Sequence, residues 1–99
     1  MASFIKARVK IAGKKRTVLF FSNPNSTRER KDLTIKASLD LGESWLPENQ
    51  LVVDPRSGYG YSSLVRLDAK TIGILYEGVG DLYFAKYSVD RILLSLKKK

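Results

Sequence analysis

A strict alternation of apolar and polar side chains constrains the fold of this chain more than any other feature. Residues 5–11 alternate aliphatic with basic side chains, and residues 32–37 alternate aliphatic with polar ones. Residues 17–21 form a continuous β-branched and aromatic run, which is typical of a more buried strand. Because no long segment has an apolar period of 3.6 residues, the sequence predicts an all-β protein.

Clusters of turn-forming residues divide the chain into seven predicted strands. We expect these strands at 5–11, 17–21, 32–37, 51–53, 61–67, 71–76 and 82–88. Turns or loops are expected where Gly, Pro, Asn, Asp and Ser concentrate, at 13–15, 22–27, 40–47, 56–60, 68–70 and 78–81. The last segment, 90–96, is compatible with a helical turn or with a short strand.

Consecutive hairpins of this kind predict antiparallel four-stranded meanders. A meander of roughly 45 residues is the unit of a β-propeller blade. Strands one to four would form one blade, over about residues 1–55. Strands five to seven would form most of a second, over about residues 56–96. The second blade then lacks a fourth strand, which in propellers the chain's other terminus commonly supplies.

The composition excludes several kinds of site. The chain has 99 residues, with no cysteine and no histidine. This excludes a disulfide scaffold, a cysteine- or histidine-ligated metal and a Ser-His-Asp triad, and we expect neither a metal nor a cofactor. The longest apolar runs, at 18–21 and 92–94, are too short to span a bilayer. No signal-peptide core precedes Lys6, so no signal peptide is expected in this form.

The charge balance favours an anionic partner. Eighteen Lys and Arg against ten Asp and Glu give a formal net charge of +8. Nucleic acid, an acidic membrane surface or an acidic sugar would suit such a charge. Three of the cations, however, lie at residues 97–99 and three beside a predicted turn at 14–16, so a solvated face with a solubilising tail is the plainer explanation. No RNA-binding or zinc-finger motif accompanies the charges, and no specific nucleic-acid binding is expected.

The turn between the third and fourth predicted strands has a distinctive sequence, SLDLGESW at residues 38–45. Asp40 can accept backbone N–H groups inside the turn, and Gly42 permits a positive φ. Ser38 and Ser44 can tie the turn to the strands, and Trp45 can cover it. A generic D-x-G hairpin would explain only Asp40 and Gly42. The full spacing matches the Asp box, S-x-D-x-G-x-(S/T)-W, a structural motif on the blades of sialidases and some other propellers.

Further motifs surround this turn, namely LFFSNP at 19–24, Arg30, YGYSSL at 59–64 and GILYE at 73–77. In this order and spacing they closely resemble the C-terminal part of bacterial exo-α-sialidases (neuraminidases), from about residue 2 to about residue 87. The resemblance implies about two blades of a six-bladed β-propeller. It also implies a retaining glycoside hydrolase that removes terminal sialic acid from sialylated glycans. Members of the family are typically secreted, periplasmic or on the bacterial cell surface.

One implied role concerns the substrate carboxylate. Arg30 matches the third arginine of the cluster that clamps this group in the family. A guanidinium suits the task because its planar fork binds a carboxylate at two points. Arg28 lies two residues away and is an alternative for this position. Without the resemblance, Arg30 is simply a solvated loop charge.

Two further roles concern the reaction itself. Tyr61 matches the catalytic tyrosine of the Y-S-x-L motif. A sialoside carries a carboxylate on its anomeric carbon, which repels a carboxylate nucleophile but not a neutral phenol activated by a base. Tyr59 is the nearest competitor, and a packed ring with a capping hydroxyl is the structural alternative. Glu77 matches a glutamate that supports the arginine clamp in the family. The structural alternative is that Glu77 is simply a charged residue at the end of a buried strand.

Strand alternation groups these residues without help from the resemblance. In an antiparallel meander, the loop between strands two and three opens at the same end as the connection between strands four and five. Strand six also ends there. We therefore expect Arg30, Tyr61 and Glu77 at one end of the sheets and the Asp box at the other.

Several catalytic parts of the family have no counterpart in this sequence. We find no motif for the glutamate that activates the tyrosine, for the acid/base residue or for two further arginines. The isolated chain is therefore expected to be inactive. Its exposed blade edges suggest self-association, for example of three copies with two blades each. The alternative function is that of a non-catalytic propeller fragment, or of an engineered self-assembling β module, with weak polyanion binding.

Overall fold

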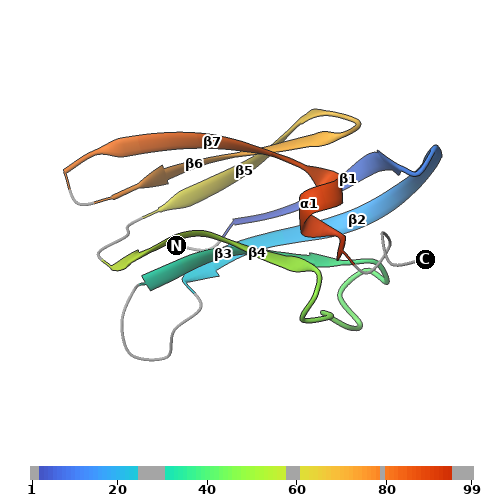
Figure 1. Ribbon diagram of the computed structural model, residues 1–99, viewed down its shortest axis with the longest axis horizontal. Helices are drawn as coiled ribbons and strands as arrows, with labels where there is room; N and C mark the ends of the chain where they lie inside the picture. The colour runs from blue at the N-terminus through green and yellow to red at the C-terminus, as the bar shows by residue number, and fades with distance from the viewer. Residues whose placement is uncertain (1–2, 25–30, 58–60, 79, 95–99) are drawn as a thin grey trace.

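Two antiparallel sheets and one short helix form the structure, a computed structural model that describes residues 3–24, 31–57, 61–78 and 80–94 (Figure 1). The first sheet has the order β1-β2-β3-β4 and the second the order β5-β6-β7. The seven expected strands are all present, which confirms the all-β meander. Their bounds, with that of the helix, are β1 Ser3–Ile11, β2 Lys14–Pro24, β3 Lys31–Ser38, β4 Gln50–Ser57, β5 Ser62–Asp68, β6 Thr71–Glu77, β7 Leu82–Ser88 and α1 Val89–Ile92.

The first hairpin turns over two residues, Ala12 and Gly13, and not over 13–15. Their φ angles are 52° and 81°. Positive values at both central positions are typical of a type I′ turn, whose twist matches that of the flanking strands. Ile11 therefore pairs with Lys14, and β2 begins three residues before the predicted start at Thr17.

Two strands extend further than the sequence predicts. The predicted loop at 22–27 begins too early, because β2 continues to Pro24 and its Ser22 pairs with Ile35 of β3. β4 covers Gln50–Ser57 and not only 51–53, and it pairs with β3 through an irregular register around Leu33. At these positions backbone pairing with a neighbouring strand outweighs the turn preference of the individual residues.

The apolar faces of the two sheets pack against each other and form one core. Phe20 and Ile35 of the first sheet and Ile72 and Ile74 of the second are completely buried in it. The last segment adopts the helical alternative, and Ile92 of α1 contributes to the same core. Two layers around one core are the usual construction of a stable domain.

Hydrogen bonds also join the two sheets along β1 and β5. The Lys10 N–H donates to the Ala69 carbonyl at 2.6 Å, and the Leu64 N–H donates to the Ser3 hydroxyl at 3.0 Å. The sheets are therefore held in a fixed relative orientation. No helix in the described part of the chain is long and apolar enough to cross a membrane.

Candidate active site

The structure brings Tyr61 and Glu77 together at the end where β5 begins and β6 ends, on the left of Figure 1. The Tyr61 N–H donates to Glu77 Oε1 at 3.2 Å, and the Glu77 N–H donates to the Tyr61 carbonyl at 3.0 Å. The Tyr61 side chain is 69% exposed, so its ring does not pack into the core. The Glu77 carboxylate thus bonds to the backbone of Tyr61, whose side chain is accessible on the same rim.

A polar link to the first sheet holds the start of β5. The Ser22 and Ser62 hydroxyl oxygens lie 2.8 Å apart, so one donates to the other. Ser22 is completely buried, and Ser62 directly follows Tyr61. A hydrogen bond with a buried partner fixes its neighbours more firmly than an exposed one, because water competes less with it. This link therefore sets the position of Tyr61 relative to the first sheet.

A second polar link holds the end of β6. The Tyr76 hydroxyl donates to Asp54 Oδ2 at 3.3 Å in the buried space between the sheets. The Tyr76 ring stacks on Tyr83 with 5.4 Å between the ring centroids. Because Tyr76 directly precedes Glu77, the link positions the Glu77 carboxylate. Sequence reasoning missed both Ser22 and Asp54, although an acid directly after the apolar run at 51–53 was a signal for the latter.

Arg30, Arg28 and Tyr59 lie outside the described residues. The described chain leaves β2 at Pro24 and enters β3 at Lys31, and the latter pairs with Ser57 at the end of β4. These strand ends lie at the same end of the molecule as the start of β5 (Figure 1). Next to Pro24, the buried Asn23 Oδ1 has no hydrogen-bond partner among the described residues, which is unusual for a buried polar atom.

The turn at 38–45 lies at the opposite end, on the right of Figure 1. Asp40 Oδ1 accepts hydrogen bonds from the Ser38 hydroxyl at 2.8 Å and from the Ser44 N–H at 2.9 Å, while Oδ2 accepts one from the Ser44 hydroxyl at 2.6 Å. The Ser44 hydroxyl, the Ser44 N–H and then the Ser38 hydroxyl stabilise the charged form and lower the pKa of Asp40 from 3.8 to about 2.

Gly42 and Trp45 complete this turn. Gly42 has a φ of 95°, and its N–H donates to the Ser38 hydroxyl oxygen at 2.8 Å. Trp45 lies at 6.2 Å from Phe21 between ring centroids. The carboxylate of Asp40 is therefore occupied by bonds within the turn, which makes the turn a structural tie between β3 and β4.

A shallow hollow of about 420 Å³ adjoins Glu77, between the end of β6 and the start of β7. Its lining includes Gly78, Gly80, Asp81 and Leu82. In the described part of the chain no group of three acidic, histidine or cysteine residues could hold a metal ion. The rim carries the exposed Tyr61, the Glu77 carboxylate and the Asp81 carboxylate, and the last accepts a hydrogen bond from the Tyr83 hydroxyl at 3.4 Å.

Comparisons with known proteins identify relatives that match most of the chain. No protein-family model matches it. A curated relative named sialidase, from Bacteroides fragilis (strain YCH46), is 52% identical over 79 residues, which are 78% of this chain and 14% of the relative. The solved structure of the Hadza microbial sialidase Hz136 has a TM-score of 0.82 at 40% identity, over 94% of this chain and 18% of its own.

A leech enzyme extends the similarity beyond microbes. This intramolecular trans-sialidase, solved with 2,7-anhydro-Neu5Ac after soaking with 3′-sialyllactose, has a TM-score of 0.71 at 29% identity. The match covers 95% of this chain and 16% of the leech enzyme. The chain thus spans less than a fifth of the length of each of these relatives. Both of its sheets belong to the shared fold, since the matched structures cover nearly all of it.

Proposed function

Because this chain is homologous to part of a sialidase and folds as about two blades of a sialidase-type β-propeller, we propose that it forms one side of a sialidase active site. Residues 1–55 and 56–96 are the two blades, and 38–45 is the Asp box of the first. The site removes terminal sialic acid from a glycan. The observation that carries the proposal is the pairing of an exposed Tyr61 with Glu77 on one rim.

Tyr61 is the nucleophile of the proposed reaction. Its phenol oxygen attacks the anomeric carbon of the sialoside while the phenol proton passes to a base in another blade. The bond to the leaving glycan breaks, and an acid/base residue, also in another blade, protonates the glycan oxygen. Water then releases the sugar, so the configuration is retained. A neutral phenol approaches the negatively charged sialoside without the repulsion that a carboxylate nucleophile would meet.

Arg30 and Glu77 handle the substrate carboxylate in this proposal. Arg30 directly precedes Lys31, the first residue of β3, in the sequence, and in this proposal its guanidinium binds the carboxylate at two points. Glu77 uses one oxygen for the Tyr61 N–H. Its other oxygen, Oε2, makes no hydrogen bond to a described residue and can pair with an arginine from another blade.

The decisive test is hydrolysis of a fluorogenic sialoside by a complete propeller that carries this segment. Tyr61→Phe keeps the ring but removes the attacking oxygen, so kcat should fall by roughly a thousandfold or more. Tyr87→Phe on β7 is the matched control and should leave kcat unchanged. Equal rates for the two variants would contradict the role of Tyr61. The 99-residue chain alone should give no turnover, because it lacks the base and the remaining arginines.

Self-association of the isolated chain follows from the same proposal. Among the described strands β7 pairs only with β6, so its outer edge offers unpaired backbone groups to another strand. In a complete propeller a strand from elsewhere in the protein covers this edge, and in the isolated chain a second copy covers it. Light scattering should show oligomers, and a well-folded monomer at high concentration would contradict this.

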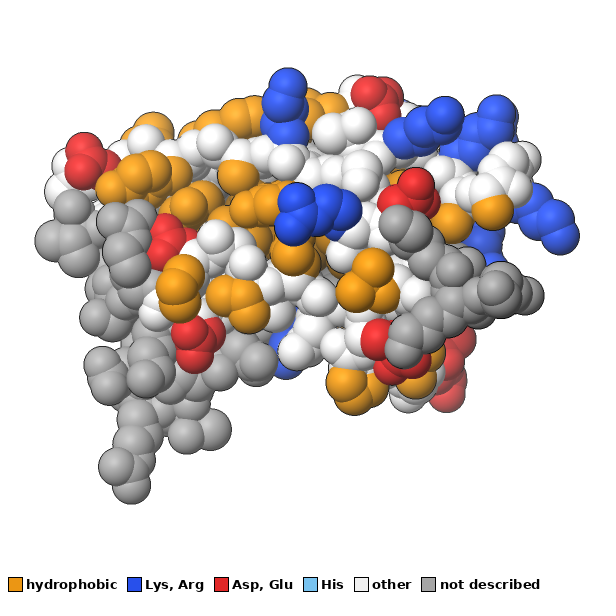
Figure 2. Space-filling model, viewed as in Figure 1, with side chains coloured by type: hydrophobic (Ala, Val, Ile, Leu, Met, Phe, Trp, Pro, Cys, Tyr) orange, Lys and Arg blue, Asp and Glu red, His pale blue; other side chains and the backbone are white. Residues whose placement is uncertain are grey.

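A second candidate function is supported by the distribution of charge. Exposed Lys and Arg side chains gather at the end of the molecule opposite Tyr61, where the β1–β2 hairpin lies (Figure 2). A non-catalytic fragment could bind polyanions there with a strong dependence on salt. Binding that Arg30→Ala leaves unchanged would assign this activity to the lysines and not to the sialic acid site.

A further inference from the structure

The exposed cations at the hairpin end lack anionic partners within the described chain. Lys6, Arg8 and Lys10 are exposed on one face of β1. Their described side-chain hydrogen bonds go only to neutral groups, as in the bond from Arg8 to the Thr17 hydroxyl at 3.4 Å. A row of charges without counterions is costly to hold in a folded chain.

Cross-strand neighbours add to this repulsion. Lys10 pairs directly with Lys15 of β2, and like charges in opposite positions destabilise a sheet. On the other side of β1, Arg66 Nε donates to the Arg8 carbonyl at 2.8 Å, which brings a further cation beside the row. An anion bound here would relieve the repulsion between these cations. The packing of the core does not require cations at these exposed positions.

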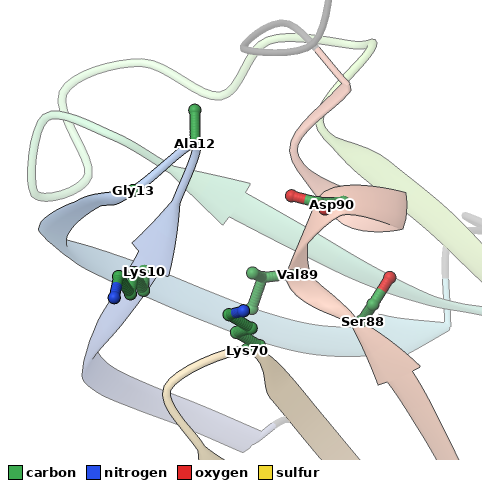
Figure 3. A pocket seen from close by; sticks show the side chains of 7 residues that line it. All are labelled: Lys10, Ala12, Gly13, Lys70, Ser88, Val89 and Asp90. Atoms are coloured by element: carbon green, nitrogen blue, oxygen red, sulfur yellow. The ribbon is translucent and has the colours of Figure 1, made fainter.

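A pocket of about 400 Å³ opens at the end of this row (Figure 3). It lies between the β1–β2 hairpin, the β5–β6 turn and the junction of β7 with α1. Lys10 and Lys70 line it together with Ser88 and Asp90. Two backbone bonds hold its walls, from Lys10 N–H to the Ala69 carbonyl at 2.6 Å and from Val89 N–H to the Lys70 carbonyl at 2.8 Å.

We propose that this basic pocket binds a phosphate group that carries one proton, either as hydrogen phosphate or as the singly ionised form of a phosphate monoester. The ammonium groups of Lys10 and Lys70 supply point charges for the phosphate oxygens. The Ser88 hydroxyl makes no capping hydrogen bond to the helix and is a further donor. This site is separate from the proposed sialidase chemistry, since Tyr61 and Glu77 lie at the other end of the sheets.

Asp90 gives the pocket a preference between phosphate and sulfate. Its carboxylate repels a fully ionised anion but accepts a hydrogen bond from a P–O–H group. Hydrogen phosphate has such a proton at neutral pH, whereas sulfate has none. Phosphate should therefore bind more tightly than sulfate, and Asp90→Asn should reduce the difference.

Titration of the 99-residue chain with inorganic phosphate at constant ionic strength, followed by NMR of the backbone amides, tests the proposal. Shifts should concentrate at residues 10–14, 69–71 and 88–90. Lys10→Gln and Lys70→Gln should each weaken binding about tenfold, the scale of one charge-assisted hydrogen bond. Lys86→Gln, an exposed lysine on β7, removes the same charge elsewhere and should change little.

A parallel titration with a sugar phosphate monoester, run with inorganic phosphate near pH 5, where the ester keeps one proton because its second pKa is about 6, identifies the source of the group. Tighter binding than that of inorganic phosphate assigns the pocket to an esterified ligand, and weaker binding assigns it to the free ion. Equal losses in the Lys10, Lys70 and Lys86 variants would show diffuse attraction and overturn the proposal. Shifts confined to the opposite end of the sheets, or the absence of binding, would overturn it as well.

Discussion

The first sheet has four strands and the second has three, although both turn an apolar face towards the same core. The third strand of each sheet differs in its neighbours and in the side chains that it leaves exposed. In β3, which has a neighbour on both sides, Leu33, Thr34 and Ile35 are all buried. In β7, the corresponding strand of the second sheet, Leu82 is 66% and Phe84 53% exposed. The second sheet therefore leaves the outer edge of β7 unpaired among the described strands, with apolar side chains exposed on that strand.

The two sheets also end differently. The first continues from β3 through the tied turn at 38–45 into β4. The second passes from β7 directly into α1, whose Val89 and Ile92 enter the core. The helix thus fills the space between the sheets but does not pair with β7. In the sialidase propeller that we propose, a strand from outside this chain completes the second sheet.

The shared core makes the two sheets dependent on each other, and this gives the largest expected effect. Ile74→Ala in the second sheet should lower the free energy of unfolding by roughly 2–5 kcal/mol, because it leaves a cavity at a fully buried position. Trp45 is the single tryptophan and lies between β3 and β4, where it contacts Phe21 of β2, so its fluorescence reports on the first sheet. In urea, its transition should move with that of the whole protein.

Phe20→Ala in the first sheet is the matched change. It should move the same single transition by a similar amount. If the urea midpoint followed by Trp45 fluorescence did not change after Ile74→Ala, the two sheets would unfold separately. This result would contradict the claim that they share one core.

The exposed apolar side chains of β7 allow self-association to be assigned to one of the two sheets. Phe84 lies across Gly73, where a Cβ atom would meet its ring at 2.9 Å. It is exposed on β7, the strand with the unpaired outer edge, so a second copy that pairs with this edge is expected to cover its ring as well. Phe84→Lys should weaken self-association about tenfold or more, since burial of such a ring contributes roughly 1.5–3 kcal/mol. Val52→Lys, at a similarly exposed position on β4 of the first sheet, is the control. An equal loss of self-association with Val52→Lys would contradict the prediction, because it would show that the contact is not specific to the second sheet.

The stability that the turn at 38–45 gives to the first sheet is expected to depend on pH. This effect is smaller than that of the core substitutions. The folded pKa of Asp40 is depressed, chiefly by the Ser44 hydroxyl, from 3.8 to about 2. Its contribution to stability is therefore complete above the unfolded pKa and is lost as the pH falls towards 2. Asp40→Asn should be less stable than the parent chain at pH 6 and equal to it near pH 2. Glu43→Gln in the same turn should show no such convergence.

The smallest expected effect concerns the β1–β2 hairpin. Ala12 has a positive φ of 52°, which costs an alanine roughly 1–2 kcal/mol. Ala12→Gly removes this strain but adds unfolded-state entropy, so a net stabilisation of about 1 kcal/mol or less is expected. Ala69→Gly in the β5–β6 turn, where φ is not positive, should be neutral or destabilising. The two midpoints in urea give the comparison.

Much of the fold could be predicted from the sequence, because side-chain alternation is a local property. The alternation at 5–11 and 32–37 located β1 and β3, and the alternating directions of seven strands grouped Tyr61 with Glu77. The end of β2 could not be predicted, since Ser22 and Pro24 favour turns and only pairing with β3 keeps them extended. The link between Asp54 and Tyr76 was hidden for the same reason, as it joins residues that meet only when the sheets pack.

The central claim is that Tyr61 carries the chemistry of a sialidase site. Its most direct test is peptide mapping by mass spectrometry after a complete propeller with this segment has reacted with a fluorinated sialoside that slows release of a covalent intermediate. The account predicts one sugar adduct, on the peptide that contains Tyr61, and none in the Tyr61→Phe variant. An adduct on Tyr59 or on a carboxylate, in an enzyme whose Tyr61→Phe variant remains active, would contradict it.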